Sequence, residues 1–441
     1  MLTIDLIKQQ FEQFQSRLNG QKQLPAHQLR KVALEHVLQN RLPSAKDEEW
    51  RFTNPQPLLE TPFQVADDQA GKSLTPDQLK PYLYSGFEGI NLVFVNGYFI
   101  PHLSSQLETE GPIKIWPLSE VVQKDEALLA EIHNKEIVEY NTFSALNVAM
   151  FSDGLYLEIP SETVLEVPVN ILNLGLGQKR NANNVLRNII KIGDHSFVRL
   201  IETFLSLDDE LHFTNSLTTV ALGEHARMVH NKIHNENSSA YHVKNVLVKQ
   251  QQSSQYVSNN ITFGGRLVRN NIKVTLQGEF ADAKLNGLYM GHGSQHQDNH
   301  TLIEHAAPNC TSHELYQGIL IDKASAVFAG KILVERDAQK TDAIQSNNCL
   351  LLSDDARIDT MPQLEIYADD VKCTHGATVG QLDEEAIFYL RSRGISETRA
   401  KNFLIYSFAE QIIEQIKVDS VRDYVDQIIL QRFKEDMNFV K

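Results

Sequence analysis

The chain has 441 residues, of which 42% are hydrophobic and 22% are charged, an ordinary composition for a globular protein with a large core. Its formal net charge is −15, whereas nonspecific nucleic-acid binding requires an excess of basic residues, so we expect no nucleic-acid partner. The sequence contains neither an apolar run of ~18 residues nor a signal-peptide pattern, which favours a cytoplasmic protein without a membrane partner.

Residues 1–150 are predicted to form a helical and mixed N-terminal region. Apolar residues recur at helical spacing at Ile7, Phe11 and Phe14, and Pro25 stands where a second helix can begin. Residues 91–100, NLVFVNGYFI, have the composition of strands joined by an Asn-Gly turn.

Residues 151–376 are predicted to be a β-domain. Short runs rich in Val, Ile, Leu and Thr, such as VLEVPVNILNL and IKVTLQGEF, follow one another without a helical pattern between them. Many short strands in one region indicate a sandwich, a propeller or a β-solenoid. The pattern alone does not choose among these three.

Residues 377–441 are predicted to form a C-terminal helical domain. Gly394 can end a first helix, and Ser396 and Ser420 can cap the next two. Two apolar stripes follow: Ala400, Phe403, Leu404, Phe408, Ile412, Ile413 and Ile416, and then Tyr424, Val425, Ile428, Ile429 and Phe433. The stripes can pack on the β-domain or can form part of a docking surface for a partner.

The three cysteines, Cys310, Cys349 and Cys373, show no CxxC spacing, so reduced thiols are expected rather than a disulfide framework. They are too few for the full thiolate set that usually holds an iron–sulfur cluster. Cys373 is followed two positions later by His375, and a thiolate with an imidazole binds zinc, iron or copper well. Any cluster site would therefore be shared with another chain.

Two histidine-rich segments are further candidates for metal sites. The first set is His292, His296, His300 and His305, with His313 beyond, and the second is His225, His230, His234 and His242. The surrounding sequence is rich in turn residues rather than helical. We interpret both sets as polar ladder and turn positions on the surface of a β-structure, in preference to metal sites.

Motifs for nucleotide or hydrolytic chemistry are missing from the sequence. Gly330-Lys331 is followed by Ile332, so the phosphate-binding loop of an ATPase is not formed there. Neither a G-x-S-x-G elbow nor an H-E-x-x-H motif is present. The chain is therefore not expected to be an enzyme by itself.

Three long segments resemble one known family. They are DEEWRFTNPQPL at 47–58, the run from FGGRLVRNN to VFAGKI at 263–332, and ADDVKCTHGATVGQLDEEAIFYLRSRGI at 368–395. Together they are similar to the SufB/SufD family of the SUF machinery, which assembles iron–sulfur clusters. Gly376 stands where B-type members carry the glutamate of a His-Glu-Ala motif, so the resemblance is to the D-type branch.

The resemblance implies a mainly β fold, with a central right-handed parallel β-helix between helical ends. It implies a non-catalytic scaffold subunit that pairs with a SufB-type paralogue and docks a SufC-type ABC ATPase. A transient iron–sulfur cluster, or iron, would be shared with the SufB-type chain at their interface, and the isolated chain would hold none tightly. The isolated chain would form a homodimer.

The site residues follow from the same resemblance. His375 is the expected cluster or iron ligand, and Cys373 is the second candidate. Tyr389 and Arg391 are the expected contacts for the ATPase. Two alternatives stay open: a homodimeric structural β-helix protein, and a carbohydrate-active β-helix enzyme, against which the missing signal peptide counts.

Overall fold

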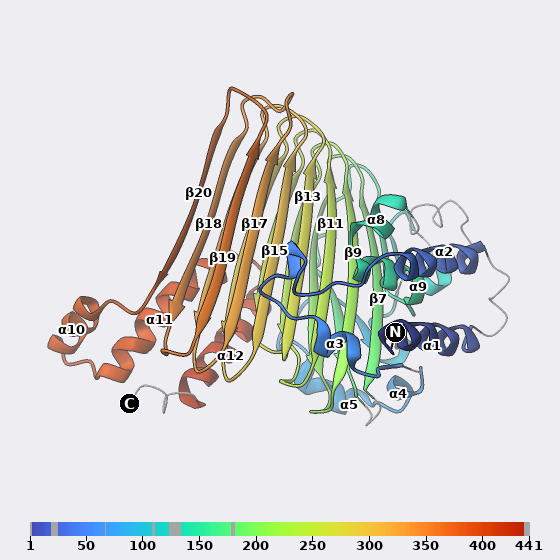
Figure 1. Ribbon diagram of the computed structural model, residues 1–441, viewed down its shortest axis with the longest axis horizontal. Helices are drawn as coiled ribbons and strands as arrows, with labels where there is room; N and C mark the ends of the chain where they lie inside the picture. The colour runs from blue at the N-terminus through green and yellow to red at the C-terminus, as the bar shows by residue number, and fades with distance from the viewer. Residues whose placement is uncertain are drawn as a thin grey trace.

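The computed structural model describes residues 2–18, 25–66, 68–107, 111–122, 134–177 and 181–435. Its centre is a parallel β-solenoid, in which successive strands alternate between two facing sheets (Figure 1). The prediction of a mainly β fold with helical ends is confirmed, and the sandwich and propeller alternatives are wrong. Within the described ranges, no helix is both long enough and apolar enough to cross a lipid bilayer.

One sheet, here called the odd sheet, contains β4 (Lys114–Pro117), β5 (Leu155–Ile159), β7 (Ala182–Ile192), β9 (His212–Leu222), β11 (Tyr241–Gln250), β13 (Leu267–Leu276), β15 (His296–His305), β17 (Ser325–Val334) and β19 (Arg357–Ile366). The short β1 (Gln64–Val65) pairs with β7.

The other sheet, here called the even sheet, contains β3 (Tyr98–Phe99), β2 (Ile90–Val95), β6 (Val169–Gly175), β8 (Phe197–Ser206), β10 (Arg227–Asn235), β12 (Gln255–Thr262), β14 (Asp282–Gly291), β16 (Thr311–Leu320), β18 (Asp342–Leu351) and β20 (Lys372–Gly380).

The coils of the solenoid repeat in length and backbone conformation, and not in sequence. Leu267 lies opposite His296 and His296 lies opposite Ser325, so these coils advance 29 residues each. Corner residues of successive coils adopt the same left-handed conformation and are joined through backbone hydrogen bonds to the next corner. They are His195, His225, Ser253, Phe280, Asn309 and Lys340, with φ between 54° and 60°. Since their side chains differ widely, no sequence repeat is visible.

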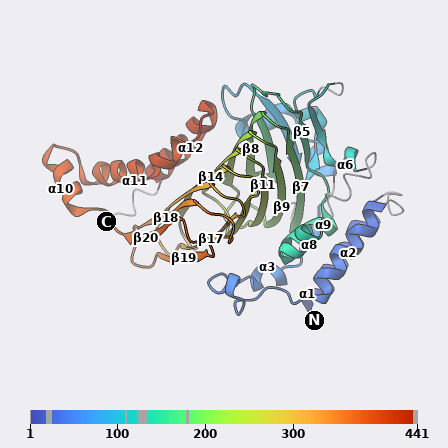
Figure 2. The same ribbon diagram turned by 90° about the horizontal axis from the view of Figure 1, so that it is seen from above.

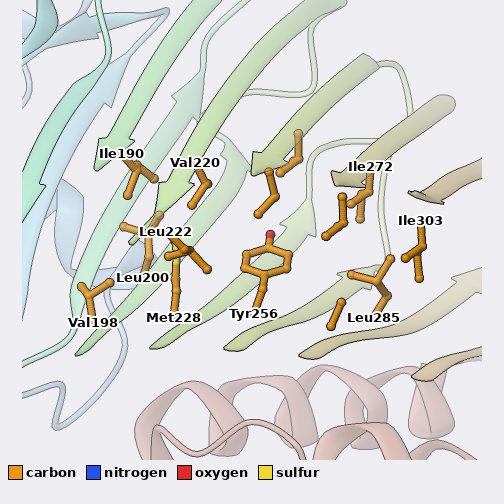
Figure 3. Close-up of a cluster of buried hydrophobic side chains, with 14 of the residues drawn as sticks. Ile190, Val198, Leu200, Val220, Leu222, Met228, Tyr256, Ile272, Leu285 and Ile303 are labelled. Carbon is orange, nitrogen blue, oxygen red and sulfur yellow. The ribbon is translucent and has the colours of Figure 1, made fainter. Parts of the chain in front are cut away.

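The main core fills the space between the two sheets. Alternate residues of each strand point inward, and residues at the same level of successive coils form rows along the solenoid (Figure 3). Val198, Met228 and Tyr256 form one such row on the even sheet, and all three are buried. Burying a side chain of this size contributes roughly 1.5–3 kcal/mol, so the rows stabilise every coil they cross.

Most of the N-terminal helices cover the outer face of the odd sheet, and these are α1 (Leu2–Ser16), α2 (Pro25–Gln39), α3 (Gln56–Glu60), α6 (Leu118–Val121), α8 (Lys135–Tyr140) and α9 (Thr142–Met150). The short α4 (Gln69–Lys72) and α5 (Pro76–Leu79) lie instead beside the even sheet, next to β2. Phe11, Phe14 and Phe143 share one apolar cluster with Phe213 and Leu217, which lie on the outer face of β9. Packing against this face, rather than helical propensity alone, holds the short helices in place.

The segment Trp50–Thr53 is tied to the middle of the odd sheet by buried polar contacts. The hydroxyl of Thr53 donates to Asp298 at 2.6 Å, and Arg269 pairs with the same carboxylate at 2.7 Å. The Arg269 guanidinium also lies 4.0 Å from the centre of the Trp50 ring. The Trp-Arg-Phe-Thr segment therefore anchors the N-terminal region to the solenoid.

The C-terminal helices α11 (Glu397–Ile413) and α12 (Asp419–Glu435) cover the outer face of the even sheet, on the opposite side from α1 and α2 (Figure 2). The preceding α10 (Glu384–Ser392) contacts α11 and projects away from the solenoid. Ile405, Ile412 and Ile429 pack against Ile233 and Ile261 of β10 and β12. The residues of the predicted stripes are buried or half-buried here, with the exception of Phe403, which is exposed because it lies on the far side of α11.

The division into residues 1–150, 151–376 and 377–441 stays a prediction. The structure places β2 and β3, from the N-terminal region, in the even sheet beside β6. At the other end β20 continues to Gly380, because residues up to this glycine keep their register with β18.

Candidate functional site at the open end of the solenoid

The last coil of the solenoid ends in two strands that each pair with a single neighbouring strand among the described residues. β19 pairs with β17 and β20 pairs with β18, and each stands last in its sheet. The N–H of Lys372 donates to Thr341, so the alternation of a parallel ladder directs the N–H groups of residues 373, 375, 377 and 379 away from β18. Such an unpaired edge is a template for pairing with another chain.

Cys373 and His375 lie on this last strand and point to the same side of it. They stand opposite Ala343 and Gln345, both of which are buried inside the solenoid. Because alternate residues of a strand share one face, Cys373 and His375 continue the inner face of the coil. Cys373 is half-buried against Ala343 and Ala368, whereas His375 is exposed.

The two side chains differ in what they can offer a metal. Burial, helped by Asp342, raises the pKa of the Cys373 thiol, so it stays protonated until a cation or a base is brought to it. The exposed imidazole of His375 can act as a ligand without rearrangement. The other two cysteines lie inside the structure, and burial raises the pKa of Cys310 to about 11 and of Cys349 to about 12.

Apolar side chains surround this end of the solenoid, and sequence reasoning missed them. Tyr367 is 61% exposed, Val379 is 45% exposed, and Ile366 is also exposed. In strands these residue types usually face a core, so their position at an edge becomes visible only from the register. Exposed apolar residues beside a free strand edge are typical of an interface with another protein.

Tyr389 and Arg391 lie on α10, which follows β20 directly. Tyr389 is 57% exposed, and its hydroxyl accepts a hydrogen bond from Arg393 at 2.9 Å. Arg391 is exposed and pairs with Glu397 of α11 at 3.2 Å. Both predicted contacts are therefore accessible, on a different element from Cys373 and His375.

Phe388 was missed by the sequence analysis. It is 73% exposed, because its neighbour Ile387 takes the buried face of the short α10. An aromatic residue this exposed beside Tyr389 makes α10 an apolar surface without a partner in the described part of the chain. The sequence could have predicted this exposure. Adjacent residues of a helix face different directions, so Phe388 cannot share the buried face of Ile387.

The histidines of the first set do not gather into one site. Nε2 of His296 donates a hydrogen bond to the Thr53 hydroxyl at 2.8 Å, since that hydroxyl donates its own proton to Asp298, and His300 lies 2.8 Å from Asp298. His305 is buried against Ser312, while His313 is exposed on β16. The prediction of polar contacts rather than a metal site therefore describes these residues, although His305 lies inside the solenoid.

The surface interpretation of the second set is wrong for three of its four members. His225 lies at a corner, stacked on His195 with ring centres 4.7 Å apart. His230, His234 and His242, in contrast, are buried inside the solenoid. Their carboxylate partners, Glu202 for His230 and Glu236 for the other two, outweigh the cost of burying a polar ring.

The fold and this end of the molecule together define a parallel β-solenoid protein with a free-edged end and flanking helices. Comparison with known proteins gives the family. Residues 176–408 match the family model described as SUF system FeS cluster assembly, SufBD core domain, and residues 4–171 match the SufBD protein N-terminal region. The chain belongs to the SufB/SufD family of iron–sulfur cluster assembly proteins.

Relatives support the D-type branch. The chain is 32% identical to the iron–sulfur cluster assembly protein SufD of Escherichia coli, over 90% of this chain and 91% of the relative. It is 31% identical to an iron–sulfur cluster assembly SufBD family protein of Synechocystis sp., over 88% and 87% of the two chains. It is 28% identical to the chloroplastic protein ABCI7 of Arabidopsis thaliana, over 91% and 84%. This homology supports a role in iron–sulfur cluster assembly.

Proposed function

We propose that this chain is a non-catalytic scaffold subunit of a SUF complex and that its open solenoid end pairs with a SufB-type paralogue. The observation that carries the proposal is the free edge of β19 and β20, where an exposed histidine stands among exposed apolar residues. A second solenoid of the same family offers matching strand edges, so that the two sheets can continue from one chain into the other.

The nascent cluster is the cargo of this interface rather than a resident cofactor. His375 supplies the ligand on this side, and Cys373 joins it once a cation lowers the pKa of its thiol. The SufB-type chain supplies the remaining ligands. An imidazole among thiolates is a ligand type that iron accepts, and a site divided between two chains can open to release its cargo.

The SufC-type ATPase docks on the C-terminal helices. Tyr389 and Arg391 were expected there, and Phe388 adds the largest exposed apolar side chain of the same helix. ATP hydrolysis takes place in that partner, so this chain needs no phosphate-binding loop. When the SufB-type chain is missing, two copies of this chain pair through the same end, giving a homodimer. The complex works in the cytoplasm.

Co-purification tests the proposal. The tagged full chain is expressed together with a SufB-type paralogue and a SufC-type ATPase, and the bound proteins are identified and quantified. We expect both to be retained in a fixed ratio. A chain that retains neither protein, while eluting as a folded species, would overturn the proposed function.

A further inference from the structure

A cluster of histidines around one carboxylate lies inside the solenoid, away from the open end. Glu236 follows β10 directly, and its Oε2 lies 2.8 Å from Nε2 of His234 and 2.8 Å from Nδ1 of His242. His242 stands near the start of β11, so a single corner of the chain brings the three groups together. In the described ranges they are the only three His, Cys, Asp or Glu side chains whose ligand atoms all lie within 4.8 Å of one another.

The hydrogen bonds within this cluster leave polar atoms without partners. His234 and His242 are fully buried, and both present a nitrogen to the same carboxylate oxygen. The opposite ring nitrogens, Nδ1 of His234 and Nε2 of His242, have no hydrogen-bond partner. Buried polar atoms are nearly always paired, because leaving one unpaired costs about 1–3 kcal/mol. The nitrogens that converge on Oε2 of Glu236 are Nε2 of His234 and Nδ1 of His242, and the unpaired nitrogens lie on the opposite edges of the two rings.

We propose that His234, Glu236 and His242 form a binding site for a single divalent first-row transition ion such as Zn²⁺ or Fe²⁺. Two imidazole nitrogens and a carboxylate oxygen are ligands that these ions favour. The nitrogen–oxygen distances of 2.8 Å need to open only to the roughly 3.3 Å that separates ligands around a tetrahedral ion with bonds of about 2.0 Å. The site is independent of the cluster proposed at the open end.

Neighbouring groups hold the carboxylate in place. Nε2 of His212 lies 3.3 Å from Oε1 of Glu236, and the hydroxyl of Thr214 donates to the same oxygen at 2.6 Å. Contacts of this kind orient a carboxylate that binds a metal through its other oxygen. A Cβ atom at Gly175 would lie 2.4 Å from Nε2 of His212, so the glycine leaves the space that this imidazole occupies.

The charges around the site are compatible with a dication. Burial alone would raise the pKa of Glu236, but its contacts with three imidazoles hold the pKa well below the ordinary value, so the carboxylate is ionised. Burial lowers the pKa of His234 and His242, and neutral imidazole is the form that binds metals. Lys232 is the nearby cation. Its Nζ donates a hydrogen bond to Oδ1 of Asn270.

A surface hollow gives an ion access to the cluster. It has a volume of about 430 Å³ and is lined by Glu236, Asp208, Asp209, Asn235 and His292 among others. Two aspartates at the mouth favour the approach of cations. Of the three proposed ligands, Glu236 lines this hollow, whereas His234 and His242 lie outside its lining.

Cobalt titration of the full chain tests the proposal, because Co²⁺ substitutes for Zn²⁺ and reports its ligand geometry through visible absorption. After treatment with a chelator, the folded protein is expected to bind one Co²⁺ tightly, with a dissociation constant of about 10 µM or below, and Zn²⁺ should displace it. The melting temperature should rise on binding. A folded chain that binds no Co²⁺ with this stoichiometry overturns the proposal.

Matched variants locate the ion. His242→Gln and Glu236→Gln should each lose the Co²⁺ absorption, while His375→Ala, at the open end, should keep it. Loss of the signal in His375→Ala alone would place the ion at the open end and refute the proposed site. Retention of the full signal in His242→Gln would refute it as well. The wild-type titration stays decisive if a buried substitution prevents folding.

Discussion

At the scale of single residues, exposure separates histidines with structural roles from a histidine available to a ligand. His305 is buried against Ser312, and burial lowers its pKa to about 4, which keeps it neutral. His375 lies on an edge strand in solvent. The sequence singled out His375 through its neighbour Cys373 and its family context. It could not show which of the remaining histidines are buried, because burial depends on the register of the coils.

Replacing His375 by alanine should separate function from stability. An exposed side chain contributes little to folding, so the free energy of unfolding should change by less than about 0.5 kcal/mol. Cluster formation on the assembled complex should fall by about tenfold or more, since even outer contacts to metal ligands are worth ~10-fold in affinity. Melting temperature and cluster content are measured on the same samples.

The matched control is His313→Ala, which removes another exposed histidine of the even sheet, on β16, the second strand from β20. It should leave both quantities unchanged. A stable His375→Ala variant with wild-type cluster content would remove this residue from the mechanism.

The buried pair of Glu202 and Lys244 should be essential to folding although it lies in no proposed site. The ammonium of Lys244 lies 2.6 Å from the carboxylate, which also accepts from Asn188 and Thr218. Lys244→Met removes the ammonium that balances a buried carboxylate, so it should cost about 3–5 kcal/mol. Adding Glu202→Gln should restore most of that loss. Chemical denaturation of both variants measures the difference, and equal losses in the single and double variants would contradict the assignment.

The same carboxylate makes stability depend on pH. The contacts of Glu202 with Lys244 and His230 outweigh burial and hold its pKa well below the ordinary value in the folded state. Its contribution is therefore present above the unfolded pKa of about 4.3 and is lost as the pH falls through the folded pKa. Between about pH 5 and pH 3 the wild-type protein should lose more stability than Glu202→Gln, as measured by denaturation at each pH. A parallel decline in both proteins would contradict the assignment.

At the scale of elements, local signals in the sequence identified the C-terminal helices well. Gly394 adopts a left-handed φ of 87° just after α10, and the hydroxyl of Ser396 caps α11. Ser420 does not cap a helix, since α12 already begins at Asp419. Phe403 was placed in the buried stripe but faces solvent, because Ala400 and Ile405 take the contact face of α11. Helix boundaries follow from local chemistry, whereas the buried face depends on what the helix packs against.

The apolar surface of α10 should be the main anchor of the ATPase. Phe388→Ser should weaken its binding by about 2 kcal/mol or more, roughly 30-fold in Kd, as expected for an aromatic residue at the centre of an interface. Leu430→Ser, which changes an exposed residue of α12, is the matched control and should bind as wild type does. Affinity is measured by calorimetry with the purified ATPase. Equal affinity of the Phe388→Ser variant would move the docking surface elsewhere.

Point variants are preferable to removing the C-terminal helices. Deleting residues 383–441 would expose Ile233, Ile261, Leu288 and other apolar residues on the outer face of the even sheet. A truncated chain would then lose partners through aggregation as well as through the missing contacts.

At the scale of the whole molecule, the composition of residues 151–376 was enough to predict a β-domain but not to predict the architecture of that domain. Each coil is closed by a corner that conserves a left-handed backbone conformation and not a residue type, as His195 and Phe280 show. The family resemblance, not the pattern, supplied the β-helix. The buried cluster around Glu236 was out of reach because its members become neighbours only when the chain turns the corner between β10 and β11.

The isolated chain should neither hydrolyse ATP nor retain an iron–sulfur cluster. Its sequence has no phosphate-binding loop, and the proposed ligands Cys373 and His375 are too small a set for a cluster. Phosphate release measures ATP hydrolysis, and visible absorbance after gel filtration measures any retained cluster. ATPase activity in a preparation free of the partner, or a stoichiometric cluster absorbance, would count against the account.

The pairing of the open end is tested most directly by blocking the free edge of β20 alone. Ala377 directs its N–H to this edge, so Ala377→Pro should leave the ladder to β18 intact and remove one donor from the interface, with Ala377→Ser as the control. Analytical ultracentrifugation of each variant with the SufB-type paralogue measures complex formation. We predict that Ala377→Ser pairs as wild type does and that Ala377→Pro stays folded but unpaired. A folded Ala377→Pro variant that pairs with wild-type affinity would contradict the central claim.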